Sequence, residues 1–311
     1  MRKQSKIQAL LQWKSIFYGN FFYALCAVAL SIESAFQSKS ALAPALFFVL
    51  EFVAVIWFYN KAYLKTEEEL NANNDRQAWY LAHRKVLVRF QKFLLLILIV
   101  IALSLLFLHG KFLALQKPDF FILLLVFPLV SFLYYGYTIA GKTIKLRRVG
   151  WLKPILIAVS WAGMVNFYPL LYQSFVNHTV LQLPSGIYFL FLKNLVFIGL
   201  LAVLFDIKDY TTDLNFELKT VVVKMGVYKT LYFLIIPLCL LAWLLFLGYA
   251  IQHGFPTERI AINTLPLLLV ALVSTQLSPQ KNILYYLTVI DGLMLVKAIC
   301  GIVAALIYSS K

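Results

Sequence analysis

Acidic residues are scarce in this chain, with 13 aspartates and glutamates against 28 lysines and arginines in 311 residues. Charged residues of both signs make up only 13% of the sequence, whereas 62% is hydrophobic, and the mean hydropathy is +0.83. A soluble domain has too small an interior for this much apolar surface, so we expect the chain to lie in lipid. Cysteine is also rare. Cys26, Cys239 and Cys300 all fall in apolar stretches and show no metal-binding or disulfide spacing, which favours buried, small hydrophobic side chains.

Apolar stretches of about 20 residues are long enough to cross a ~30 Å hydrocarbon core as helices. The sequence predicts an all-α, polytopic membrane protein in which residues 1–311 form a single transmembrane domain. The nine expected spans are 16–36, 41–60, 91–109, 119–140, 153–173, 186–206, 229–251, 260–277 and 283–307. A short basic tail leads directly into the first span, a pattern that does not indicate a cleavable signal peptide.

Positive charge is concentrated on alternate connections between these spans. The N-terminal tail and every second connection together carry 21 lysines and arginines, whereas the other connections carry only Lys39, Lys111, Lys117 and Arg259. This bias predicts an N-terminus inside and a C-terminus outside, in a bacterial inner (cytoplasmic) membrane. We attribute the net charge of +15 to the same bias and to attraction to anionic lipid headgroups, and not to nucleic-acid binding.

Two predicted cytoplasmic connections are unusually long, 61–90 and 207–228. Each follows a helix that runs from outside to inside, and four helices separate them. This order predicts two four-helix units plus a ninth helix around a cavity that is open to lipid. Residues 74–90 mix apolar and cationic side chains. This pattern fits either a short amphipathic helix, on the membrane surface or over a cavity mouth, or a plain connecting helix.

Three carboxylates stand at the end of the sixth span: Asp206, Asp209 and Asp213. Their spacing places them within roughly 60° of one another around a helix. Such a stripe is either a solvated surface or a set of hard oxygen ligands that holds Mg²⁺ and, through it, a diphosphate.

The segment DIKDYTTDLNFELKTVVVKMG resembles the second aspartate-rich motif of the UbiA-type intramembrane prenyltransferases. The three aspartates fill its acidic positions, and Thr220, Val223 and Gly226 fill a T-x-x-V-x-x-G tail. A weaker similarity lies in the basic connection after the fourth span. The residues that carry it are Tyr137, Lys145, Arg147 and Arg148.

The resemblance implies a helical ring around a lipid-open cavity and transfer of a polyprenyl group from its diphosphate to a lipid-soluble acceptor. It implies that Asp206, Asp209 and Asp213 hold Mg²⁺. The diphosphate would then lie near Lys145, Arg147 and Arg148. Aromatic residues, 16% of the chain, would line the cavity and keep water from a carbocation.

The first aspartate-rich motif of that family is incomplete here. Asn60 and the acidic Glu68 are present, but Lys61 and Leu64 replace the two leading aspartates. A lysine repels Mg²⁺, so either Lys61, with Lys65, contacts the phosphate directly or catalysis is weakened or lost. Prenyl transfer is the first hypothesis, and a non-catalytic isoprenoid- or lipid-binding protein is the second. A small-solute transporter is the third, and it is less favoured because the carboxylates gather at one end.

Glu51, Lys193, Asp291 and Lys297 are ionisable residues within the expected spans, away from the inner connections. A lone charge at such depth costs at least ~2.5–3.5 kcal/mol, so these residues should pair or face a polar cavity. We expect Glu51 to pair with Lys193 or Lys297, and a contact with substrate is the alternative.

Overall fold

The computed structural model describes residues 13–64, 75–135, 137–139, 142–144, 149–215 and 217–308. Helices dominate, and several expected spans are assembled from consecutive α, 3₁₀ and π segments. The longer helices are α3 (Phe21–Gln37), α4 (Ala45–Tyr63), α5 (Asp75–His109), α6 (Pro118–Tyr135), α7 (Lys153–Val176), α8 (Ile187–Lys208), α12 (Ile236–Gln252), α13 (Thr257–Thr275) and α15 (Gly292–Tyr308). The short segments are α2 (Trp13–Tyr18), η2 (Gly110–Leu115), η4 (Gly150–Leu152), α9 (Tyr210–Asn215), α10 (Val221–Met225), α11 (Val227–Lys229), η5 (Thr230–Ile235), α14 (Ile283–Tyr285) and η6 (Tyr286–Ile290).

Each of the nine expected spans overlaps a helix or a run of helical segments, although residues 137–139, at the end of the expected span 119–140, form a strand. Within the described residues, six of these are long and apolar enough to cross a membrane: Asp75–Leu115, Gly150–Val176, Ile187–Lys208, Val227–Gln252, Thr257–Thr275 and Ile283–Ile307. Phe21–Gln37 and Pro118–Tyr134 are apolar but shorter. The predicted all-α polytopic architecture is therefore confirmed, whereas the count of nine spans is not.

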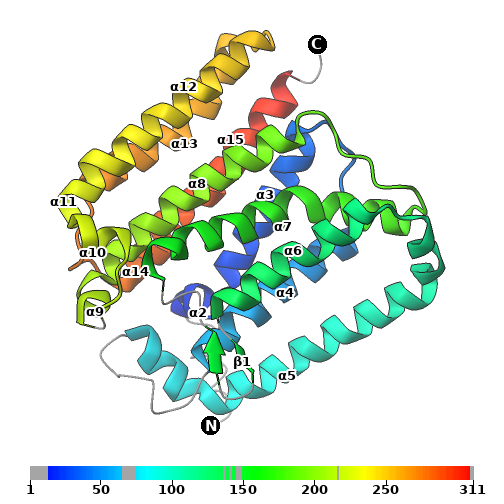
Figure 1. The fold of residues 1–311 in the computed structure, drawn as a ribbon, viewed down its shortest axis with the longest axis horizontal. Helices are drawn as coiled ribbons and strands as arrows, with labels where there is room; N and C mark the ends of the chain where they lie inside the picture. Colours follow the sequence, from blue (N-terminus) through cyan, green and yellow to red (C-terminus); the bar gives the residue numbers. More distant parts are fainter. Residues whose placement is uncertain are drawn as a thin grey trace.

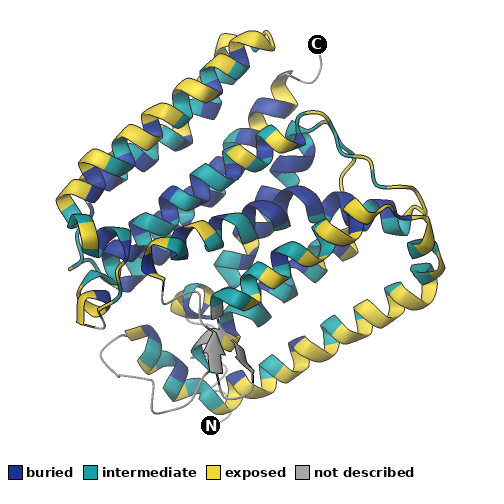
Figure 2. Cartoon of the chain, viewed as in Figure 1, coloured by how far each residue is buried: buried dark blue, intermediate teal, exposed yellow. Residues whose placement is uncertain are grey.

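The helices form a bundle with a buried centre and two exposed flanks. Figure 1 shows α7 and α8 side by side in the middle, the α12–α13 pair on one flank and α5 on the other. The apolar stretches of α7 and α8 are 61% and 50% buried, whereas that of α5 is only 6% buried and its residues are mostly exposed or intermediate (Figure 2). Its outward side chains are large and apolar, as expected for the lipid-facing side of a membrane helix.

Small side chains let α3 and α15 approach closely at the centre. Ala24 and Ala27 of α3 and Ala298 of α15 are completely buried, and close approach of this kind is what packs helices together in lipid. Cys26 and Cys239 are buried, unoxidised thiols, as the sequence predicts, whereas Cys300 is half-buried.

The two long connections differ from each other in structure. Residues 75–90 do not form a separate amphipathic helix, because they are continuous with the next span as the first half of α5. The 207–228 connection folds into the short helices α9, α10 and α11. After α6, the strands β1 (Tyr137–Ile139) and β2 (Lys142–Ile144) form an antiparallel hairpin that pairs residue 138 with residue 143.

Candidate functional site

One ammonium group holds together the ends of the two central helices. Lys153 is the first residue of α7, and its Nζ lies 2.5 Å from Asp206 Oδ1 and 3.4 Å from Asp209 Oδ2. Asp206 lies in the last turn of α8 and is only 1% exposed, whereas Asp209 caps the helix at the surface of the site. Pro154 at the first turn of α7 fixes where that helix begins, and so positions the lysine beside α8.

The three predicted carboxylates lie on two consecutive helices, and their role as Mg²⁺ ligands stays a prediction. Helix α8 ends at Lys208 and α9 begins at Tyr210, so Asp213 lies on a separate short helix. A hydrogen bond from the Asp213 amide to the Asp209 carbonyl, 2.7 Å long, keeps the two turns in register. Asp213 is buried like Asp206.

The residues of the T-x-x-V-x-x-G tail have structural roles here. The Thr220 hydroxyl accepts a hydrogen bond from the Val223 amide and so caps the start of α10. Gly226 adopts φ 79° between α10 and α11, a conformation that disfavours a side chain. The tail therefore turns the chain back toward the next span just beyond the carboxylates.

A second polar cluster lies on another part of the site, around the guanidinium of Arg76. Arg76 is buried, and its Nη1 donates to the Tyr63 hydroxyl at 3.0 Å. Its Nη2 donates to Asn20 Oδ1 at 2.7 Å, and Asn20 Nδ2 in turn donates to Asn60 Oδ1 at 2.8 Å. The Tyr80 hydroxyl also donates to Asn60 Oδ1. Asn60, which the sequence resemblance places at the site, therefore helps to position Arg76 indirectly, through the Asn20 amide.

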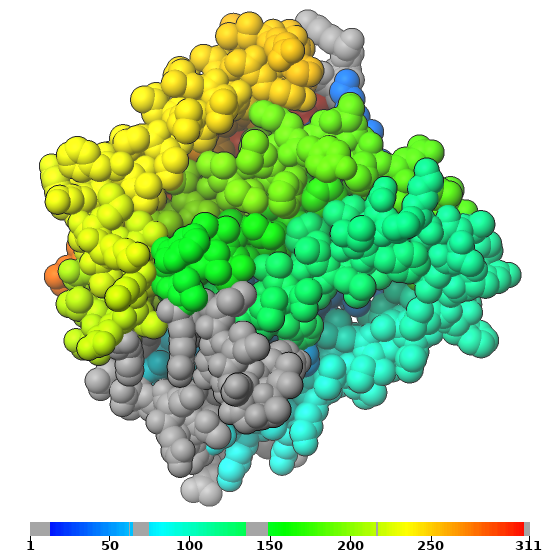
Figure 3. All heavy atoms as spheres, in the orientation of Figure 1, coloured from blue at the N-terminus to red at the C-terminus, as the bar shows by residue number. Residues whose placement is uncertain are grey.

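Both clusters line a single cavity of about 560 Å³, a volume within the usual range for small-molecule sites. Its polar lining includes Lys153, Asp206 and Asp209 from one cluster and Arg76, Asn20 and Tyr63 from the other, together with Asp291. Its remaining lining is mostly apolar, and Leu98 of α5 and Phe132 of α6 belong to it. Figure 3 shows the face of the molecule hollowed between α5 and α6.

Aromatic rings are packed along the inner part of the cavity. The Tyr23 ring meets the Trp161 ring edge-on at a centroid distance of 4.7 Å and the Tyr59 ring at 4.6 Å. Trp161 Nε1 donates to the Tyr59 hydroxyl at 2.6 Å, so both polar groups are satisfied inside apolar surroundings. Trp57 also lines the cavity.

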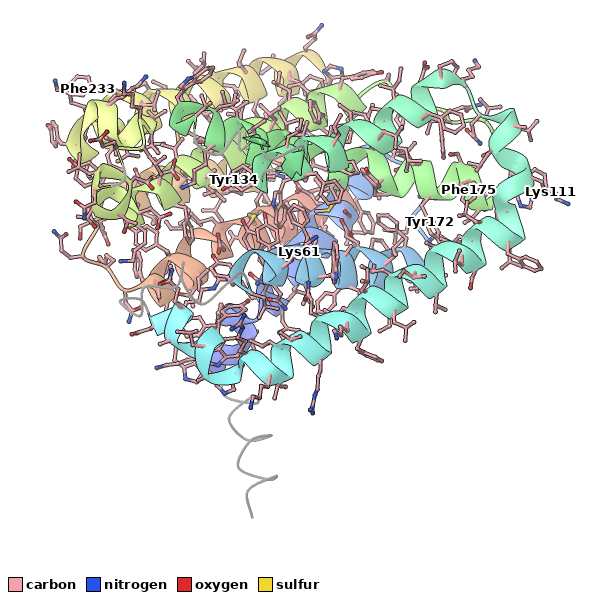
Figure 4. All side chains as sticks on the ribbon, turned by 60° about the horizontal axis from the view of Figure 1, so that its bottom comes forward. Lys61, Lys111, Tyr134, Tyr172, Phe175 and Phe233 are labelled. Carbon is pink, nitrogen blue, oxygen red and sulfur yellow. The ribbon has the colours of Figure 1, made fainter. Side chains whose placement is uncertain are left out.

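The other predicted site residues lie apart from these clusters or outside the described residues. Lys61 is exposed, and its Nζ lies 5.1 Å from the centroid of the Trp57 ring; Figure 4 labels it on α4, with Tyr134 on α6. Its contact with a diphosphate stays a prediction. Glu68, Lys145, Arg147 and Arg148 lie outside the described residues, as does the side chain of Tyr137.

The expected pairing of Glu51 is wrong. Lys193 and Lys297 both pair with Glu33 of α3, a buried carboxylate that we did not predict. Glu51 instead accepts a hydrogen bond of 2.6 Å from the Ser31 hydroxyl and lines the main cavity. The error arises because depth along a helix does not specify which side of the helix a residue occupies.

Sequence reasoning missed Lys153 and Arg76 as site residues. Lys153 lies at the start of an apolar span just before a proline, which was a usable signal for a residue at a helix end. Arg76 is one of six lysines and arginines in the 61–90 connection, and nothing in the sequence distinguishes it from the others.

The described residues do not fit a pair of Mg²⁺ ions. Among them, no group of three or more histidine, cysteine, aspartate or glutamate side chains is arranged to hold a metal. The Lys153 ammonium lies between the two carboxylates that would have to converge on a metal, and the leading positions of the first motif hold Lys61 and Leu64. Fixed cations stand where such an arrangement needs oxygen ligands.

No protein-family model and no curated protein sequence matches the chain. Two solved structures resemble its fold along almost the whole length. One, from a study of digeranylgeranylglyceryl phosphate synthase in membranes, is 17% identical with a TM-score of 0.53, covering 94% of this chain and 98% of the other. The other is a UbiA homologue from Archaeoglobus fulgidus bound to GPP and Mg²⁺, 15% identical with a TM-score of 0.53, covering 92% and 99%. The chain therefore has the fold of the UbiA-type prenyltransferases, as its sequence predicts.

Proposed function

We propose that this protein transfers a prenyl group from a prenyl diphosphate to a lipid-soluble acceptor within the membrane. The observation that carries the proposal is the cavity of about 560 Å³, which has charged groups at its two polar clusters and aromatic rings elsewhere. A prenyl diphosphate has the same division, because a strongly anionic head is joined to an apolar tail. The shared fold and the GPP bound to the Archaeoglobus homologue support this substrate class.

The two buried cations are the groups that would receive the diphosphate. Arg76 presents a planar fork of donors that matches phosphate oxygens, and Lys153 supplies a compact charge. When the allylic C–O bond breaks, its electron pair leaves with the diphosphate, and both cations stabilise the added charge. The acceptor then forms a bond to the allylic carbon and releases a proton, which the departing diphosphate can take.

The aromatic lining has a second role in the same step. The faces of Trp and Tyr rings attract positive charge, so Tyr23, Trp57 and Trp161 favour an allylic cation over its neutral precursor. Apolar walls exclude water that would otherwise capture this cation.

A role for Mg²⁺ is implied by the sequence resemblance and by one structural neighbour. The sequence resemblance assigns Asp206, Asp209 and Asp213 to Mg²⁺, and the Archaeoglobus homologue was bound to Mg²⁺. Because the described residues of this chain do not fit a two-metal arrangement, the proposed steps rely on the fixed cations Arg76 and Lys153. We propose instead that Arg76 contacts the diphosphate directly, in place of a metal ion held by the first acidic motif.

The test is saturable binding and turnover of geranyl diphosphate by the purified protein in lipid nanodiscs. Diphosphate affinity should exceed that for geraniol, which has the same tail without the anionic head. Asp206→Asn should change diphosphate affinity while leaving geraniol affinity unchanged. Binding without release of diphosphate in the presence of varied aromatic acceptors would favour the non-catalytic isoprenoid-binding hypothesis. Equal affinity for both ligands would contradict the proposed function.

A further inference from the structure

A second cluster of buried charges lies at the opposite end of α8 from Asp206. Lys297 Nζ of α15 lies 2.5 Å from Glu33 Oε2, and Lys193 Nζ of α8 lies 3.7 Å from Glu33 Oε1. Lys193 precedes Asp206 by 13 residues, which is about 20 Å along a helix. Two ammonium groups therefore share one carboxylate, and the main cavity includes neither of them.

The remaining partners of Lys193 are neutral. Its Nζ donates to Gln37 Oε1 at 3.0 Å and to Asn263 Oδ1 at 3.1 Å. The Gln37 amide in turn donates to Glu33 Oε1 at 2.8 Å. These amides satisfy the lysine's hydrogen bonds but do not cancel its charge, so the cluster keeps one uncompensated positive charge.

Arg259 of α13 adds a second uncompensated charge beside this cluster. Its carbonyl accepts a hydrogen bond from Asn263 Nδ2, and its guanidinium lies 3.8 Å from the centroid of the Phe255 ring. The Nε atom is buried and has no hydrogen-bond partner among the described residues. Within the same residues Arg259 forms no ion pair, even with the neighbouring Glu258, which is exposed.

A small cavity of about 40 Å³ separates these cations. Gln37, Lys193, Arg259 and Asn263 provide its polar lining, and aromatic rings such as Phe246 close it from other sides. A water-sized group needs roughly 10–15 Å³ on this scale, so there is room for the oxygens of a small anion. Gly301 forms one wall of this cavity. It is packed so closely that an added Cβ would lie 2.4 Å from Glu33 Oε1.

Excess positive charge at this depth is costly unless a proton is lost or an anion binds. We propose that this cavity binds a phosphate group, contacted by Lys193 and Arg259. Arginine's donor fork suits phosphate oxygens, and lysine adds a point charge. The phosphate can come from an anionic lipid headgroup, since the site lies near a helix end, or from free phosphate. The site is separate from the proposed diphosphate site and does not depend on it.

The experiment compares thermal unfolding in nanodiscs of phosphatidylcholine alone with unfolding in nanodiscs that also contain phosphatidylglycerol. The variants are Arg259→Gln, Arg259→Lys and the control Lys111→Gln. Lys111 is an exposed cation at one edge of the molecule, where its side chain projects outward (Figure 4). Phosphatidylglycerol should raise the unfolding temperature of the wild type and of Lys111→Gln. Arg259→Gln should weaken this lipid's apparent affinity by about tenfold or more, because a charge-assisted contact is lost, and Arg259→Lys should keep part of it.

A second arm adds inorganic phosphate to nanodiscs of phosphatidylcholine alone. Stabilisation by phosphate that Arg259→Gln removes would support the site and identify free phosphate as a sufficient source. Stabilisation by phosphatidylglycerol alone would identify the lipid headgroup as the source. Equal unfolding temperatures for the wild type in every condition would overturn the proposal. So would a lipid effect that Arg259→Gln leaves unchanged, or one that Lys111→Gln also abolishes.

Discussion

Replacing Lys153 by methionine should be the most damaging single change at the candidate site. Methionine keeps most of the apolar stem, but it removes the ammonium that lies 2.5 Å from Asp206 Oδ1. Asp206 is 1% exposed, so its carboxylate would stay buried without that partner. Removing one partner of a buried ion pair typically costs about 3–5 kcal/mol in the free energy of unfolding.

Neutralising both partners should be much less harmful. In the double variant Lys153→Met with Asp206→Asn, neither member of the buried pair is charged, and a neutral replacement of a buried pair is often close to isoenergetic. We therefore expect the sum of the two single losses in the free energy of unfolding to exceed the loss in the double variant by at least about 2 kcal/mol. Asp209 contributes less to this coupling, because its contact with Lys153 is 3.4 Å long and more exposed.

The assay is reversible unfolding in mixed detergent micelles, followed for the wild type, both single variants and the double variant. Lys224→Met is the matched control. Lys224 is an exposed lysine near the same end of the molecule, and its replacement should cost less than about 0.5 kcal/mol. Additive single effects, or a Lys153→Met variant as stable as the control, would refute the argument that a buried pair joins α7 to α8.

Three further changes test the site and its orientation. Arg76→Gln should weaken geranyl diphosphate binding about tenfold or more while sparing geraniol, whereas Lys61→Gln should change it less than twofold, because Lys61 is exposed; equal losses of both ligands in Arg76→Gln would indicate a purely structural role. Removing divalent cations with EDTA should reduce diphosphate binding without abolishing it, since Arg76 and Lys153 remain, and complete loss would require a metal. In a variant lacking the native cysteines, Thr212→Cys should be labelled only from the inside, and labelling from outside would contradict the predicted topology.

The architecture could be predicted because hydropathy depends on local sequence. Each expected span overlaps a helix or a run of helical segments, with boundaries a few residues away, as for 186–206 against Ile187–Lys208. The number of crossings could not be fixed the same way. Helix α3 spans 17 residues and α6 spans 18, lengths that a tilted or a locally thinned bilayer accommodates differently.

The site was only partly predictable, because its cations come from elements that are distant in sequence. The spacing of Asp206 and Asp209 placed both carboxylates at one helix end, and they share a partner there. That partner, Lys153, is more than 50 residues away, and no local pattern links the end of α8 to the start of α7. Glu33 was missed for a related reason. Its carboxylate is stabilised by Lys297 across the α3–α15 contact, which only the fold reveals.

The two charged clusters along α8 differ in the sign of the charge that predominates. Near its C-terminal end, the carboxylates of Asp206 and Asp209 share the ammonium of Lys153, so a diphosphate bound there would draw on a further cation, Arg76. Near its other end, Lys193, Lys297 and Arg259 exceed the single charge of Glu33. Because α8 is one continuous helix with half of its apolar stretch buried, a phosphate bound between Lys193 and Arg259 would hold α8 against α13. That contact would steady the helix on which the carboxylates of the main cavity depend.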